Sequence, residues 1–269
     1  MCVSMAKADF KGTRICLNDT NVPGLGQVHV LMYQNTAVSF AGPNAMLLHI
    51  PTQDIGQENF VDTSRFPHIL DDMVDAHTPR NRGALRSAPK SVGSVQVFDV
   101  GMYTVVLAKS ASDIPAALNR VPEAKRPMLN PALFDFYENA YPDFAVALCC
   151  FNSRFMSQAE PIMLWYPANC TENYRLPGID CHTGGVPTLG VPVDVDHWLF
   201  LASDNMRGGK QVRYRERGMI PMDVLRLLPE QVYGAELHGR MPNGDFGIQE
   251  PKMLEYWGIT RLAPPVRIV

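Results

Sequence analysis

The sequence lacks the features that identify several large classes of protein. Charged residues make up only 19% of it and the net charge is −3, so neither sign of charge favours a highly charged partner. The longest strongly apolar run, residues 144–151, is far shorter than the roughly 20 residues of a membrane-spanning helix. No basic segment followed by an apolar run opens the chain, so we expect no secretory signal and a cytoplasmic location.

Motifs of common enzyme and metal-binding classes are missing too. The sequence has no Walker phosphate-binding loop, no Gly-x-Gly-x-x-Gly fingerprint, no His-Glu-x-x-His helix and no Gly-x-Ser-x-Gly elbow. Among the six cysteines the one close pair is Cys149 and Cys150, which would point to opposite faces of a strand. We therefore expect reduced thiols, no metal and no cofactor.

What the chain does contain is an ordinary globular composition. Hydrophobic residues make up 46% of it, enough for a substantial core, and its 22 prolines favour many short elements joined by fixed turns. Strand patterns outnumber helical ones. We expect an α+β fold with mostly antiparallel sheets and a few short helices, in a single compact domain over residues 1–269, with residues 78–91 as a flexible loop.

Periodicity and turn residues locate the expected elements. The predicted strands are residues 13–17, 28–33, 45–50, 92–98, 103–107, 144–151, 161–166 and 193–201. Helices are expected at residues 70–77, capped by Thr63 or Ser64, and after Asn130, with shorter ones at 112–118 and 221–228. Residues 144–151 should form a central strand with both faces buried, and the chain after residue 228 should be rich in turns.

Four segments have a recognisable order along the chain. They are HVLMYQNTAVSFAGPNAMLLHIP, VFDVGMYTVVLAKSASDIPAALNRV, LFDFYENAYPDFAVALCCF and PIMLWYPANCTENYRLPG. Over residues 1–178 this order resembles the bacterial domain-of-unknown-function family 2330, whose members carry a Gly-x-Tyr-x-Val-x-x-Leu strand, a Tyr-rich helix and a Phe-x-Val-Ala strand. The resemblance supports the expected fold and implies no chemistry.

Cys2 is the sharpest functional candidate. A small second residue permits removal of Met1, which would leave a free α-amine beside the thiol, as in N-terminal-nucleophile amidohydrolases. Asn35 and Asn44, each next to a predicted strand, could donate hydrogen bonds to an oxyanion. The alternative is that Cys2 is a small apolar residue on a first strand.

A second arrangement could combine a cysteine with an imidazole and a carboxylate. Cys181 and His182 lie in a loop rich in Gly and Pro, and the sequence Asp-Val-Asp-His ends at His197. A nearby imidazole lowers the pKa of a thiol, and a carboxylate such as Asp180 can orient the imidazole. Because adjacent residues do not easily form such a pair, we expect Cys181 with His197, or Cys2 with either histidine. His182 could equally be solvated.

The strand pattern around His197 favours a structural role for that histidine. Alternation along residues 193–201 places His197 on an apolar face with Val195 and Leu199. Asp194 and Asp196 fall on the other face, so we do not expect them to orient the imidazole. A core histidine is therefore favoured over a catalytic base.

Together these residues predict a cysteine-dependent hydrolase or amidotransferase that acts on an amide-type bond of a small-molecule or peptide substrate. The competing hypothesis is a non-catalytic binding or structural protein that contacts a protein partner through the basic residues 207–217. Arg213, Arg215 and Arg217 alternate there and would share one face of a strand. Because few aromatics are interleaved, nucleic acid is not expected as a partner, nor is a membrane.

Overall fold

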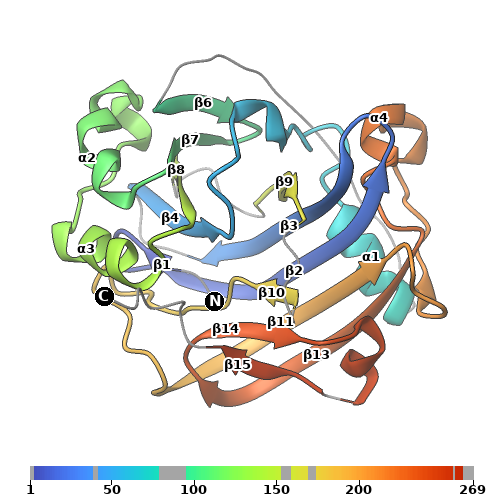
Figure 1. Ribbon diagram of the computed structural model, residues 1–269. Helices are drawn as coiled ribbons and strands as arrows, with labels where there is room; N and C mark the ends of the chain where they lie inside the picture. The colour runs from blue at the N-terminus through green and yellow to red at the C-terminus, as the bar shows by residue number, and fades with distance from the viewer. Residues whose placement is uncertain are drawn as a thin grey trace.

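The protein is described by a computed structural model that covers residues 3–38, 42–78, 95–152, 159–168, 174–256 and 258–262. Two large β-sheets face each other, a small third sheet lies beside them, and short helices cover their outer faces (Figure 1). The expected α+β class with mostly antiparallel sheets is thereby confirmed. The predicted flexible loop, apart from Thr78, lies outside the described residues.

The larger sheet has seven strands in the order β12-β13-β11-β2-β3-β9-β5. Its strands are β2 (Asp9–Val22), β3 (Gly26–Val38), β5 (Phe60–Val61), β9 (Ile162–Pro167), β11 (Pro192–Ser203), β12 (Lys210–Gln211) and β13 (Gln231–Pro242). All neighbours are antiparallel except β2 and β11, which run parallel from the pair Thr13 and His197 onwards. Strand β2 carries a bulge between Lys11 and Arg14, where Gly12 adopts a φ of 60°.

The second sheet has five antiparallel strands in the order β1-β4-β8-β7-β6. They are β1 (Val3–Ser4), β4 (Pro43–Ile50), β6 (Gln96–Val100), β7 (Tyr103–Ala108) and β8 (Ala145–Asn152). As predicted, β8 is the middle strand with both faces buried. Its Cys149 packs into the core between the sheets and its Cys150 into the core beneath the helices, so the two thiols do point to opposite faces. A third antiparallel sheet contains β10 (Tyr174–Leu176), β14 (Asp245–Ile248) and β15 (Thr260–Leu262).

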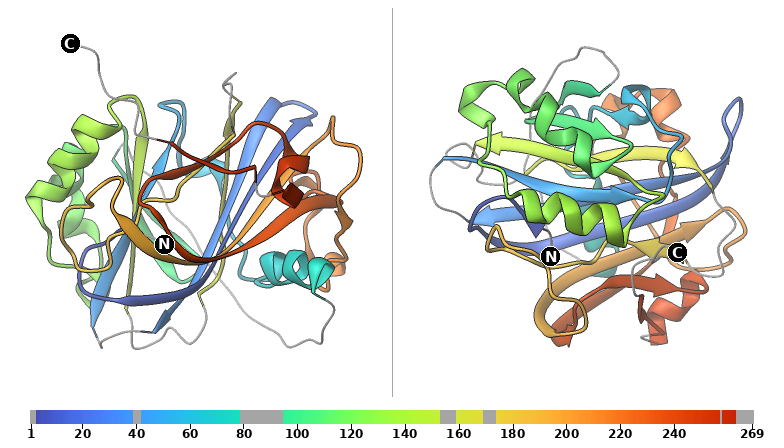
Figure 2. Two further views of the ribbon diagram at one scale, coloured as in Figure 1. Left: turned by 90° about the horizontal axis from the view of Figure 1, so that it is seen from below. Right: turned by 60° about the vertical axis from the view of Figure 1, so that its left-hand side comes forward.

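Helices lie on the outer faces of both large sheets (Figure 2). The α-helices are α1 (Ile69–His77), α2 (Ile114–Ala117), α3 (Pro131–Ala140) and α4 (Met222–Leu225). Short 3₁₀ segments occupy η1 (Gln57–Asn59), η2 (Ala111–Asp113), η3 (Leu118–Arg120), η4 (Glu123–Lys125), η6 (Arg217–Met219) and η7 (Pro251–Tyr256). Helices α2 and α3 cover the five-stranded sheet, and α1 and α4 cover the seven-stranded one. No helix in the described ranges is long and apolar enough to cross a membrane.

The two predicted helix caps had opposite outcomes. Asn130 caps α3 as expected, because its side-chain oxygen accepts a hydrogen bond from the N–H of Ala132 at 3.2 Å. Helix α1 instead begins after His68, so neither predicted residue caps it. The Thr63 hydroxyl donates to the carbonyl of Pro161 at 2.6 Å, and the N–H of Ser64 donates to Asp62.

The central core fills the space between the two large sheets. Alternate residues of nine strands of these sheets point into it, and the third sheet adds Leu176, Phe246 and Ile248. The expectation of turns after residue 228 was wrong, because β13 and β14 form there and complete this core. Their register brings polar residues from the end of the chain against the first fifty residues.

Candidate functional site

The predicted nucleophile Cys2 lies outside the described residues, but the next residue along the chain is well defined. Val3 is 1% exposed, pairs with Leu47 of β4 and bridges in parallel to Cys181. The N–H of Ser4 donates to the Cys181 carbonyl at 3.0 Å, and the N–H of Ala8 donates to the His182 carbonyl at 3.0 Å. The Cys181-His182 pair is thus held beside β1 by main-chain hydrogen bonds, at the edge of the five-stranded sheet.

Two buried side chains from the C-terminal part of the sequence hold the segment that leads to Cys181 and His182. Asn243 accepts from the N–H of Asp180 through Oδ1 at 2.8 Å and donates to the carbonyl of the same residue through Nδ2 at 2.8 Å. Asp245 accepts from the N–H of Gly178 at 3.0 Å. Because both of these side chains are fixed to a strand or its turn, residues 178–182 have one defined path.

Asp245 is the centre of a buried network of charged and polar groups. Its side chain is 0% exposed, and it accepts from His49 Nε2 at 2.9 Å, Arg175 Nη1 at 2.7 Å and the Tyr141 hydroxyl at 3.1 Å. Burial alone would raise the pKa of the Asp245 carboxyl, but His49, Arg175 and the Gly178 N–H outweigh it and lower the pKa to about 2. The residue is therefore an ionised carboxylate inside the protein.

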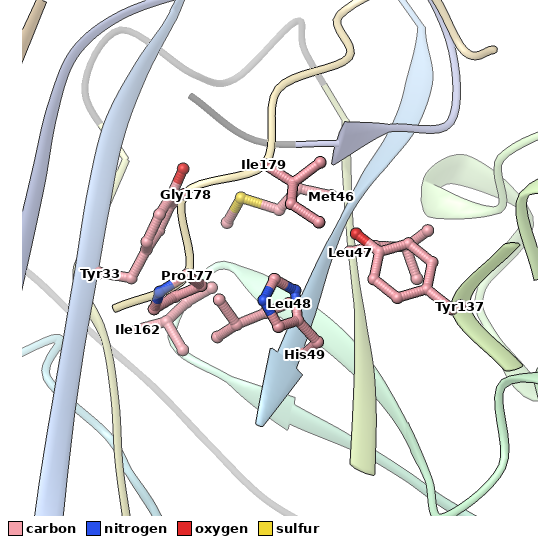
Figure 3. Close-up of a pocket in the computed structure, with 10 residues that line it drawn as sticks. All are labelled: Tyr33, Met46, Leu47, Leu48, His49, Tyr137, Ile162, Pro177, Gly178 and Ile179. Carbon is pink, nitrogen blue, oxygen red and sulfur yellow. The ribbon is translucent and has the colours of Figure 1, made fainter. Parts of the chain in front are cut away.

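A small cavity lies beside this network (Figure 3). Its volume is about 10 Å³, and His49, Tyr137 and Gly178 are among the residues that line it. The Nδ1 atom of His49 is buried there and accepts or donates no hydrogen bond among the described residues. The space is large enough for one water molecule and too small for a substrate. The role of the Asp245–His49 pair is therefore structural: it connects β14 to β4 and α3.

His197 lies on β11 and is 1% exposed. Its neighbours on the strand face, Val195 and Leu199, belong to the central core, so the predicted apolar face is confirmed. The main-chain N–H of Asp196 donates to His197 Nδ1 at 3.0 Å, a contact that favours the tautomer with its proton on Nε2. The Nε2 atom is buried and has no hydrogen-bond partner among the described residues.

The electrostatics of His197 differ from the expectation in one respect. We did not expect Asp196 to reach the imidazole, yet its carboxylate oxygen lies 3.4 Å from His197 Nδ1. Asp194, by contrast, is 93% exposed and points away as expected. Burial is the main cause that lowers the pKa of His197, to about 3, so the imidazole is neutral near pH 7.

His182 is partly buried rather than solvated. Its ring packs against Phe10 with the centroids 5.1 Å apart, and its side chain is 25% exposed. Nε2 lies 3.6 Å from Asp180 Oδ1, beyond hydrogen-bond distance, and has no hydrogen-bond partner among the described residues. Burial lowers the pKa of His182 to about 4, so it too is neutral near pH 7.

The two histidines lie near the same end of β2. Phe10, which packs against His182, belongs to β2, and the N–H of Gly12 on that strand donates to Asp196 Oδ2 at 2.9 Å. Asp196 in turn contacts His197. Two neutral imidazoles thus lie in one region of the molecule, each with a buried Nε2 atom that has no hydrogen-bond partner among the described residues.

The other predicted site residues have different surroundings. Cys181 Sγ lies 3.3 Å from Thr183 Oγ1 and 3.4 Å from the Gly185 carbonyl, so its thiol is bound within its own loop. Among the described residues no hydrogen bond joins it to His182 or His197. The expected Cys181–His197 pair is therefore not formed in this structure.

The two asparagines also differ in role. Asn44 accepts from the N–H of Ala6 at 2.9 Å and donates to the Ala6 carbonyl at 3.2 Å, so it clamps the chain after β1 rather than facing a substrate. Asn35 is 1% exposed, and its Oδ1 atom has no partner among the described residues. Its amide nitrogen makes one long contact, 3.8 Å, with the sulfur of Met46.

The predicted basic strand face is absent. Only Lys210 and Gln211 of this segment form a strand within the described residues, and the chain then turns. Arg215 binds Asp72 and Asp75 of α1 through Nε and Nη2 at 2.5 and 2.8 Å. The three alternating arginines therefore do not form one exposed surface.

Sequence reasoning missed the residues that fix this region, namely Asn243, Asp245 and His49. The dipeptide Asn243-Gly244 is a typical turn signal and could have marked the boundary between β13 and β14, which belong to different sheets. No local pattern could have paired His49 with Asp245, which is 196 positions away in the chain. In the described residues no group of three or more Asp, Glu, His or Cys side chains could hold a metal ion.

Comparisons with known proteins complete this description. No model of a known protein family matches the chain, and no curated protein matches it. The crystal structure of baculovirus P35 is similar with a TM-score of 0.43 and 14% sequence identity, over 74% of this chain and 67% of P35.

Proposed function

We propose that the chain is a cysteine-dependent hydrolase or amidotransferase that acts on an amide-type bond, with Cys2 as its nucleophile. The observation that supports the proposal best is the buried Nε2 atom of His197, which in the favoured tautomer is a donor without an acceptor among the described residues. An unpaired buried donor costs free energy in the folded state, which is a reason to look for a ligand group that it binds. A carbonyl oxygen that becomes negatively charged during acyl transfer is such a group.

The low pKa values change the roles that the sequence suggested for the histidines. A neutral imidazole with a pKa of about 3 or about 4 cannot form the ion pair that turns a thiol into a thiolate. It can still donate a hydrogen bond to an oxyanion, because that requires only the neutral N–H. We therefore assign His197 to the oxyanion and the base function to the α-amine of Cys2.

The reaction then proceeds in two balanced steps. The α-amine takes the thiol proton, Cys2 Sγ bonds to the carbonyl carbon, and the carbonyl oxygen becomes an oxyanion near His197 Nε2–H. The C–N bond breaks as the ammonium returns a proton to the leaving amine, which leaves a thioester. Water releases the acid in a hydrolase, and an acceptor amine forms a new amide in an amidotransferase.

Thiol labelling on the full chain tests the nucleophile. Intact mass should show that Met1 is absent, and iodoacetamide near pH 7 should label Cys2 at least about tenfold faster than Cys149 or Cys150. Burial raises the pKa of both control thiols, of Cys150 to about 12, so they should react slowly. Retained Met1, or equal slow labelling of every cysteine, would contradict the proposal.

A second measurement tests the oxyanion donor. With p-nitrophenyl acetate as the probe, we expect acetylation of Cys2 to fall by roughly 10²-fold in His197→Phe, while its iodoacetamide rate stays the same, because alkylation forms no oxyanion. Cys181→Ser is the matched control and should acetylate normally. Equal acetylation of the parent and His197→Phe proteins would remove His197 from the site.

A further inference from the structure

A larger hollow lies apart from the region around Asp245, His182 and His197. Its volume is about 440 Å³, and it lies where β10, β13, the end of β11 and the turn before η7 meet. Figure 1 shows these elements in one part of the molecule. The residues that matter for its chemistry are Tyr174, Ser203, Asn205, Arg207, Tyr233 and Lys252. A volume of this size is typical of pockets that bind small molecules.

Two tyrosine rings in this hollow are fixed by their hydroxyl groups. Tyr174 donates to Asp19 Oδ2 at 3.0 Å, and Tyr233 donates to the main-chain carbonyl of Arg207 at 2.9 Å. Tyr233 is also part of the central core. Since both hydroxyls are already bonded, what the rings offer a ligand is aromatic surface held in place.

The chain at the rim is held close to β13 by two glycines. Gly208 has a φ of 108°, and a Cβ atom there would lie 2.5 Å from the Tyr233 hydroxyl oxygen. Gly209 has a φ of 88°, and its Cβ would lie 2.8 Å from the carbonyl oxygen of Val232. Side chains are therefore excluded at both positions, which keeps Arg207 at the edge of the hollow.

Charged groups of both signs surround this rim, and all but one of them are paired with other described residues. Lys252 is paired with Glu250 at 2.6 Å, and Asp204 is occupied by the Thr20 hydroxyl at 2.9 Å and by a main-chain N–H of β2. In the described part of the chain the guanidinium of Arg207 forms no salt bridge. Arg207 therefore lines the hollow together with two tyrosines and keeps a cation without a salt-bridge partner among the described residues.

We propose that this hollow binds a small organic anion that carries one planar ring and one carboxylate or phosphate group. A guanidinium binds such oxygen pairs in a bidentate manner, and the two tyrosines supply the surface for the ring. Ser203 and Asn205 line the same space and offer further hydrogen bonds. This binding site is independent of the proposed acyl transfer.

Calorimetric titration of the full chain with four probes tests the proposal. Adenosine monophosphate and 4-hydroxybenzoate both contain a ring and an anion, and they distinguish a nucleotide from an aryl carboxylate. Ribose 5-phosphate has no aromatic ring and adenosine has no charge. We expect one ring-bearing anion to bind with a Kd below about 1 mM, and each incomplete probe to bind at least about tenfold more weakly, a difference of about 1.4 kcal/mol.

Variants then locate the binding. Arg207→Gln should weaken the bound anion at least about tenfold, and Tyr174→Leu should weaken it as well. Arg213→Gln removes an equally exposed arginine outside the hollow and should change nothing. The proposal is overturned if neither ring-bearing anion binds, if ribose 5-phosphate binds as tightly as the nucleotide, or if binding survives Arg207→Gln unchanged.

Discussion

The buried carboxylate of Asp245 should make one of the larger single contributions to the stability of the fold. We consider the substitution Asp245→Asn, which keeps the shape of the side chain but removes its charge. The native carboxylate has four partners, among them His49 and Arg175. After the substitution these two would face an amide in place of a charged acceptor.

The expected loss can be worked from the pKa. The carboxyl pKa falls from 3.8 to about 2 on folding, and each pKa unit corresponds to about 1.4 kcal/mol, so ionisation alone stabilises the fold by roughly 2 to 3 kcal/mol. Breaking a buried ion pair from one side typically costs about 3 to 5 kcal/mol, because the remaining charge is left without compensation. We expect Asp245→Asn to lower the free energy of unfolding by about 3 to 5 kcal/mol.

The same carboxyl predicts how stability depends on pH. Because folding depresses its pKa, the stabilisation is fully present above about pH 4 and is lost as the pH falls towards about 2. The difference in stability between the parent protein and Asp245→Asn should therefore shrink across that interval. A difference that stays constant down to pH 2 would show that charge is not the cause.

Urea unfolding followed by circular dichroism at several pH values measures both effects. Asp194→Asn is the matched control, because Asp194 is 93% exposed and should change stability by less than about 0.5 kcal/mol. A loss in the free energy of unfolding below about 1 kcal/mol for Asp245→Asn at pH 7 would refute the reasoning, because removing an ionised carboxylate with these partners should cost more.

Three further substitutions test the fold. Val146→Asp places a charge at the 1% exposed second residue of β8 and should prevent folding, so a soluble Val146→Asp protein with a cooperative melt would show that β8 is misplaced. Burial raises the pKa of the Glu216 carboxyl, so Glu216→Gln should stabilise the protein at pH 7, and this gain should shrink as the pH falls and Glu216 becomes protonated. Stability that is unchanged at pH 7 would contradict this. Gly208→Ala should lower the melting temperature because the added Cβ would collide with Tyr233. Gly218→Ala is the control and should leave the melting temperature unchanged, because the space around Gly218 is open. Equal melting temperatures for the two variants would contradict the close packing of Gly208 against Tyr233.

The parts of the fold that the sequence predicted are those with a strong local pattern. Residues 144–151 form a continuous apolar run, and Asn130 caps α3 immediately before Pro131, so neither element needed long-range information. Strand β13 was missed because Gly234, His238 and Gly239 interrupt its alternation. Its identity depends on pairing with β11, which no local pattern reveals.

The candidate site was less predictable for a physical reason. The sequence correctly placed His197 on an apolar face, but its protonation state depends on burial and on the main-chain N–H of the preceding residue. The side-chain amide of Asn44 could donate a hydrogen bond to an oxyanion, yet its hydrogen bonds with Ala6 give it a structural role. Such roles follow from tertiary contacts, and residue types alone do not determine them.

The parallel pairing of β2 with β11 has a consequence for biosynthesis. The hairpin of β2 and β3 can form early, but the other edge of β2 must wait for a strand that the ribosome delivers roughly 180 residues later, about 10 to 40 s at ordinary rates of synthesis. An open edge on a strand of this length invites pairing with other nascent chains. Lys11 and Arg14 carry charges near the start of that edge, and the bulge towards β3 bends β2 at Gly12, both features that disfavour such pairing.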